Sequence, residues 1–178
     1  MTQNKIKGIP YGVSDFANVI RDNLYYVDKT RFIPDMENQA RNLFFIRPRR
    51  FGKSLFINML RAYYDCKTTP ERFQELFGNL WIGQHPTDLQ GKFQILYLDF
   101  SQVGGDIDSL EKNFDAYCKV CFDYFVDKYN DIYSKDFIKQ VHAAENAIGK
   151  LTLINAETQR QNLSLYLIID EYDNFTNT

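Results

Sequence analysis

The residue types best suited to chemistry gather in residues 47–54, which read RPRRFGKS. The P-loop consensus is Gly, four variable residues and then Gly-Lys-Ser/Thr, and this segment keeps its second half with Arg47 at the first glycine position. Glycine lets backbone N–H groups close around a phosphate, and a helix N-terminus that follows adds a favourable dipole. The segment therefore predicts a phosphate site formed by Pro48, Arg49, Arg50, Phe51, Gly52, Lys53 and Ser54.

Two residues of this segment have predicted roles in chemistry. The ammonium of Lys53 stabilises the β- and γ-phosphates, and the hydroxyl of Ser54 coordinates Mg²⁺. Gly-Lys-Ser alone is common at helix starts, but an apolar run before it and helical spacing after it favour the phosphate site. The arginines either contact phosphates or an acidic partner, or at least one faces solvent or pairs with a carboxylate.

A second candidate group follows the apolar run at residues 165–169. This run ends in Asp170 and Glu171, which is the Walker B pattern. Asp170 is expected to hold Mg²⁺, and Glu171 to polarise the water that attacks the γ-phosphate. The alternative is a strand that simply ends in a polar turn. Asp99 ends another apolar run and is a minor candidate, because such a residue more often caps the following turn.

The elements that must position these groups alternate along the chain. Nearly continuous apolar runs at residues 43–46, 93–98 and 165–169 predict buried parallel strands. Helical spacing follows Ser54, a second helix is expected to start at Asp108 or Ser109, and a third at residues 134–147, with Gly149 interrupting or ending it. The order predicts an α/β fold, a P-loop NTPase-like parallel sheet flanked by helices.

The composition limits the function classes. The 178 residues suit one domain, and a net charge of -2 excludes a broad cationic face for non-specific nucleic-acid binding. No apolar run is long enough to span a membrane, and the N-terminus has no signal-peptide core, so a soluble cytoplasmic protein is expected. Cys118 and Cys121 have CxxC spacing within a predicted helix and are interpreted as core residues.

The sequence resembles the predicted AAA-ATPase-like family, P-loop ATPases related to archaeal-type ATPases. The similar segments are residues 9–16, 25–30, 45–54, 98–101 and 169–173. In this family arginine commonly replaces the first loop glycine. The resemblance implies ATP and Mg²⁺ as ligands, with Lys53, Ser54, Asp170 and Glu171 in the roles given above. It also places residues 25–30 close to the nucleotide, although a covering element is an equal alternative.

Members of that family are longer and often carry a C-terminal nuclease-like domain of the PD-(D/E)XK type. The chain is accordingly expected to be an N-terminal portion, truncated after the Walker B strand, that needs the missing C-terminal region. Residues 1–40 are a covering segment, which includes a possible strand at 25–27 and a short helix at 29–38, and residues 41–178 are the core. The predicted function is a MgATP-binding module that hydrolyses ATP in the complete protein. The alternative is a switch or scaffold without turnover, with an unknown protein or nucleic-acid partner.

Overall fold

The computed structural model describes residues 7–39, 42–46 and 51–173. The chain divides into two compact units, Met1–Lys92 and Phe93–Thr178, and each is described by itself. Within the described ranges, no helix combines the length and the apolar character needed to cross a membrane.

The second unit contains a parallel sheet of two strands. β1 (Gln94–Asp99) and β2 (Leu165–Asp170) pair in register from Gln94 opposite Leu165 to Asp99 opposite Asp170. Two of the three predicted strands are thus confirmed, and so is the mixed α/β character of the chain. Because the strands are parallel, their carboxyl ends lie next to each other at the same end of the sheet.

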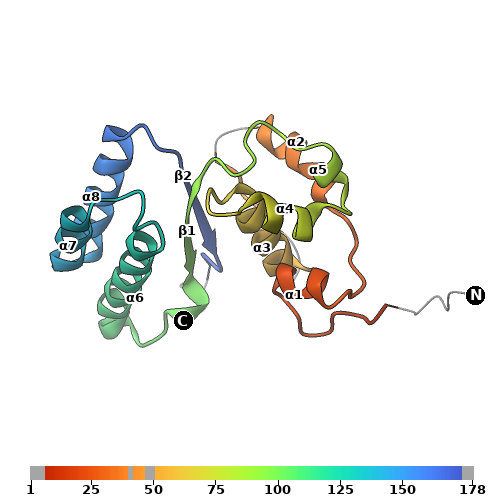
Figure 1. The fold of residues 1–178 in the computed structure, drawn as a ribbon. Coiled ribbons are helices and arrows are strands. Elements are labelled where there is room, and N and C mark those ends of the chain that lie inside the picture. Colours follow the sequence, from red (N-terminus) through yellow and green to blue (C-terminus); the bar gives the residue numbers. More distant parts are fainter. Residues whose placement is uncertain (1–6, 40–41, 47–50, 174–178) are drawn as a thin grey trace, which may run out of the picture. The chain divides into compact units, whose positions relative to one another are not determined.

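Three helices connect the two strands and gather on one side of them (Figure 1). They are α6 (Ile107–Lys128), α7 (Lys135–Ala143) and α8 (Ala147–Arg160), and the short 3-10 helix η2 (Phe100–Gln102) follows β1. Their apolar faces form one core with Leu96 and Leu98 of β1. The buried aromatic residues of that core are Phe100, Phe122, Phe125, Tyr129 and Tyr133.

The helix starts differ from the predicted ones in two places. α6 begins earlier than expected, because Asp106 rather than Asp108 or Ser109 is its N-cap and accepts a hydrogen bond from the Ser109 N–H at 3.0 Å. The predicted helix at 134–147 ends at Ala143, and Gly149 lies inside α8. The side chain of Asn146 accepts the N–H of Gly149 at 2.8 Å, so Gly149 belongs to a capped first turn.

Tyrosine hydroxyls occupy the edge of β1 that faces away from β2. The hydroxyl of Tyr129 accepts the Ile95 N–H at 2.7 Å, and that of Tyr117 accepts the Asp99 N–H at the same distance. Both tyrosines come from α6 or its C-terminal cap. The two tyrosine hydroxyls therefore supply acceptors for two backbone N–H groups of β1 that point away from β2.

The first unit is helical and rich in aromatic contacts. Its elements are α1 (Phe16–Arg21), η1 (Thr30–Phe32), α2 (Ile33–Glu37), α3 (Lys53–Tyr64), α4 (Pro70–Phe77) and α5 (Trp81–Gln84). Phe77 lies at its centre, with ring centroids 5.2 Å from Phe16 and 5.6 Å from Tyr63. The helical spacing expected after Ser54 is confirmed by α3, and the short helix expected at 29–38 by η1 and α2.

The strands predicted at residues 25–27 and 43–46 are not formed. A strand needs a neighbour to complete its hydrogen bonds, and neighbours come from distant parts of the chain that local composition does not specify. The structure assigns no regular secondary structure to residues 43–46. Phe44 and Ile46 are each 81% exposed, while Phe45 stacks on Phe56 of α3 with ring centroids 5.0 Å apart.

The cysteines differ strongly in their environment, and this predicts their reactivity. Cys66 is exposed, whereas Cys118 is buried in α6, as the sequence suggested. Burial, with the neighbouring Cys121 as a lesser cause, raises the pKa of the Cys118 thiol to about 11. Because the thiolate is the reactive form, we expect iodoacetamide at neutral pH to modify Cys66 first and Cys118 only on unfolding. Peptide mass mapping checks this order; early alkylation of Cys118 would contradict it.

Candidate functional site

Gly52, in the predicted phosphate loop, has a backbone conformation that only glycine adopts easily. Gly52 has φ 75° and ψ 28°, the left-handed conformation, and it is the N-cap of α3. Lys53 and Ser54 are the first two residues of that helix, both half-buried. The predicted loop residues Arg47, Pro48, Arg49 and Arg50 lie outside the described residues, and Phe51 is 62% exposed.

A cavity of about 220 Å³ opens beside this glycine within the first unit. Residues from the N-terminal segment form one part of its wall, and the start of α3 forms the other. The lining residues are Pro10, Tyr25, Tyr26, Val27, Lys29, Gly52, Leu55 and Phe56. The structure therefore places Tyr25, Tyr26, Val27 and Lys29 around the same cavity as Gly52. The volume lies below the range of about 300–1,000 Å³ that is typical of pockets for drug-sized ligands.

Tyr26, which lines this cavity, keeps its hydroxyl protonated and therefore neutral. Burial, with the nearby charge of Asp28 as a lesser cause, raises the pKa of the Tyr26 hydroxyl above its usual value, while a hydrogen bond with the Lys29 backbone acts in the opposite sense. The ring of Tyr26 packs edge-on against Phe16 of α1 at 5.3 Å. Tyr26 is thus a neutral, fixed surface at physiological pH.

Asp28 and Thr30 bind this segment to α5. Asp28 accepts the N–H and the hydroxyl of Thr30 at 2.8 and 2.7 Å, and its second oxygen accepts the Trp81 N–H at 2.8 Å. Thr30, fully buried, accepts the Ile82 N–H at 3.2 Å. These side chains cap the start of α5, which has no cap of its own. They also fix the backbone of Lys29 between them.

The acidic group lies at the carboxyl end of β2, in the second unit. Asp170 is buried, and its carboxylate accepts the Glu171 N–H at 3.0 Å and the Tyr97 hydroxyl at 3.4 Å. Asp99 stands beside it across the sheet, where its carboxylate accepts the Ser101 N–H at 3.0 Å and caps η2. The turn-capping alternative for Asp99 is therefore confirmed.

Glu171 has a backbone conformation that is unusual for its residue type. Its φ is 51°, in the left-handed region, and the other non-glycine residues with positive φ in the described ranges are Asn23 and Asn162. Asparagine tolerates this region far better than glutamate does. A non-glycine residue held there costs of order 1–3 kcal/mol and is enriched at functional sites.

The oxygen atoms predicted to hold Mg²⁺ belong to different units. Ser54 is in the first unit and Asp170 in the second. Hydroxyl and carboxylate oxygens are the donors that Mg²⁺ prefers, so the residue types of Ser54 and Asp170 fit the ion. Within the described ranges no three His, Cys, Asp or Glu side chains form a metal-binding group.

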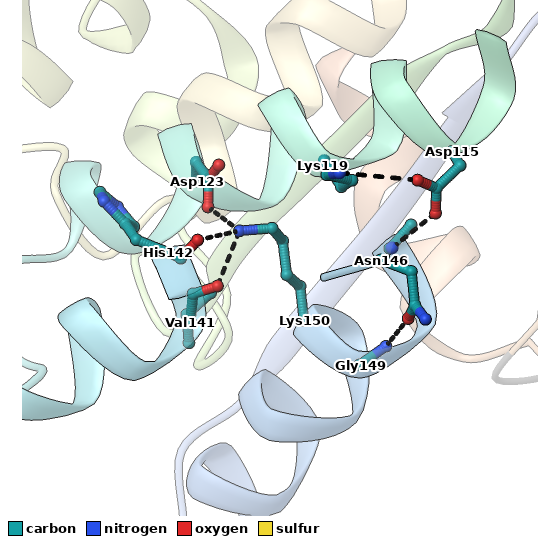
Figure 2. A network of polar contacts seen from close by, with 9 residues as sticks. Asp115, Lys119, Asp123, Val141, His142, Asn146, Gly149 and Lys150 are labelled. Atoms are coloured by element: carbon teal, nitrogen blue, oxygen red, sulfur yellow. Dashed lines mark hydrogen bonds and ion pairs between the residues drawn. The ribbon is translucent and has the colours of Figure 1, made fainter. Parts of the chain in front are cut away.

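Lys150, which carries no functional motif in the sequence, organises the second unit (Figure 2). Its side chain is 1% exposed, and its ammonium donates to the Asp123 carboxylate at 2.7 Å. It also donates to the carbonyl oxygens of Val141 at 2.7 Å and His142 at 3.0 Å, at the end of α7. All three ammonium donors are therefore used. The spacing of Lys150 could have predicted its burial, since it lies on the same buried face of α8 as Ala147 and Ile154.

Comparison with known proteins identifies the family. The chain matches the family described as Predicted AAA-ATPase over residues 10–178. It is also 47% identical over 59 residues to a protein of Azotobacter chroococcum mcd 1 described as "Uncharacterized protein in vnfD 5'region". The similar stretch is 33% of this chain and 11% of that relative, so the chain spans a small part of the curated relative that it matches. No solved structure matches the chain. The match over residues 10–178 means that the chain belongs to the Predicted AAA-ATPase family.

Proposed function

We propose that the chain is an ATP- and Mg²⁺-binding module of the P-loop type, and that the complete protein hydrolyses ATP. The observation that carries the proposal is the left-handed Gly52 at the start of α3, with a cavity beside it. A glycine in this conformation leaves the first backbone N–H groups of the helix accessible to a phosphate. Membership of a predicted ATPase family supports a nucleotide as the ligand.

Each site residue then has a distinct task. Lys53 stabilises charge on the β- and γ-phosphates, and Ser54 and Asp170 supply oxygen ligands for Mg²⁺. When bound, Mg²⁺ neutralises phosphate charge. Glu171 orients the attacking water and accepts its proton. Pro48, Arg49, Arg50 and Phe51 complete the loop around the phosphates.

The cavity suits the base and sugar of the nucleotide. Tyr25 and Tyr26 offer aromatic faces on which a base can stack, and no acidic side chain is among the lining residues, all of which are described. A wall of this kind recognises the face of a base rather than the pattern of groups at its edge. ATP is therefore assigned from the family.

The test is titration of labelled ATP with Mg²⁺ against the chain and its Lys53→Ala variant. Charge-assisted hydrogen bonds contribute about 1.5–3 kcal/mol, so the variant should bind roughly 10- to 100-fold more weakly. Lys112→Ala, at an exposed position of α6, is the matched control and should bind normally. Equal binding by Lys53→Ala would contradict the phosphate site. Binding without hydrolysis in the complete protein would favour the switch or scaffold alternative.

A further inference from the structure

We propose that Lys29 is a second cation of the phosphate site and contacts a phosphate of the nucleotide held at Gly52. The inference rests on the proposed function, because it adds a residue to the recognition of the same ligand. The P-loop consensus gives no role to Lys29, which lies 23 positions before Gly52 in the sequence (52 − 29). Its assignment comes from the structure.

The Lys29 ammonium lies close to Gly52. A methyl group built on Gly52 would lie 3.7 Å from the Lys29 Nζ atom, so the ammonium lies beside Gly52 on the side where another residue would carry its Cβ. A phosphate oxygen bound by the loop N–H groups sits about 2.7–3.2 Å from them. Such a phosphate would lie within reach of Nζ after a small side-chain rotation. Lys29 also lines the cavity beside the loop.

The neighbours of Lys29 hold it in place before a ligand arrives. The side chains of Asp28 and Thr30 are committed to each other and to the start of α5. The middle residue of the three therefore has its backbone fixed while its own side chain extends to the loop. A pre-positioned backbone lowers the ordering cost of binding.

Two lysines from separate segments would then act on one phosphate chain. Lys53 belongs to α3, whereas Lys29 precedes η1. A triphosphate carries several negative charges, and each lysine that neutralises one adds to both affinity and salt dependence. The alternative is that Lys29 only packs against the cavity wall. In that case the charge of Lys29 does not matter, and an apolar side chain of similar length changes neither the affinity for the nucleotide nor its salt dependence.

The test measures binding of two probes, MgATP and inorganic triphosphate with Mg²⁺, to the 178-residue chain. We expect Lys29→Met to bind both probes roughly tenfold more weakly and with a smaller salt dependence. Lys29→Arg should stay within about threefold of the unchanged chain, because it keeps the charge. Lys112→Met is the matched control for removal of an exposed lysine. Thermal unfolding verifies the fold, and a Lys29→Gln and Lys29→Arg pair replaces the Met variant if that one does not fold.

The outcomes separate this inference from the proposed function. If Lys53→Ala weakens binding and Lys29→Met does not, Lys29 is a packing residue and only the present inference fails. If Lys29→Met weakens ATP binding but leaves triphosphate binding unchanged, Lys29 acts through the cavity and the phosphate contact is refuted. If the unchanged chain binds neither probe, the proposed function and the role of Lys29 fail together.

Discussion

The variant Asp123→Ala is expected to lower the free energy of unfolding by about 3 kcal/mol, more than Lys150→Met lowers it. The ammonium of Lys150 is buried, whereas the Asp123 side chain is 35% exposed. Removing the carboxylate therefore leaves a buried charge with two carbonyl oxygens as its remaining partners. Removing the ammonium leaves a carboxylate that water can reach, and we expect a loss of about 2 kcal/mol, chiefly from the hydrogen bonds to Val141 and His142.

Urea unfolding followed by circular dichroism measures both losses. Lys119→Met is the matched control, because Lys119 and Asp115 form an ion pair on the same helix, α6 (Figure 2). Their charged atoms are 3.8 Å apart, both side chains are 37% exposed, and such pairs contribute about 0–1 kcal/mol. If Asp123→Ala cost no more than Lys119→Met, the buried ammonium would not be the organising group of this unit.

The second large effect is expected at Glu171 in the complete protein. Glu171→Gln should lower the rate of ATP hydrolysis by about 10²- to 10⁴-fold, because the amide cannot accept a proton from the attacking water. Because glutamine has nearly the same size as glutamate, binding of MgATP should persist in this variant. Measured turnover under saturating ATP checks this, and equal rates for the two proteins would exclude Glu171 as the base.

Glu171→Gly separates catalysis from backbone strain at the same position. Glycine adopts the observed φ of 51° without the steric cost that glutamate carries. We expect Glu171→Gly to be more stable than the unchanged chain by about 0.5–1 kcal/mol, and Glu171→Gln to be equally stable. A stability gain together with lost turnover would show that glutamate is retained here for chemistry. An unchanged or lower stability of Glu171→Gly would mean that the surrounding turn relieves the strain.

Local sequence signals predicted the parts of the fold that depend on local physics. The apolar runs that became β1 and β2 were recognisable because buried parallel strands have apolar residues at nearly every position. The helix after Ser54 was recognisable because its apolar residues recur every three or four positions. Gly52, Lys53 and Ser54 were likewise found from their order in the chain, and the structure places them where a helix begins.

The remaining features depend on contacts between distant residues. Residues 43–46 have a strand-like composition but pair with no strand in the part of the chain that the structure describes, since composition gives no information about an available neighbour. The cap that Asp28 places on α5 joins residues 53 positions apart. Lys150 looked like an ordinary helical lysine, because its partners come from α6 and α7. In each case the sequence contained the residue types but not the distances between them.

The tyrosine hydroxyls on β1 make the two edges of the sheet unequal. Tyr117 and Tyr129 use up backbone donors that another strand would need, so β1 is closed to further pairing at those positions. Within the described ranges, β2 pairs with β1 alone. We expect an additional strand, from the same polypeptide or from a second molecule, to pair next to β2 more readily than next to β1, where the Ile95 and Asp99 donors are already used. The same two hydrogen bonds disfavour edge-to-edge aggregation at β1.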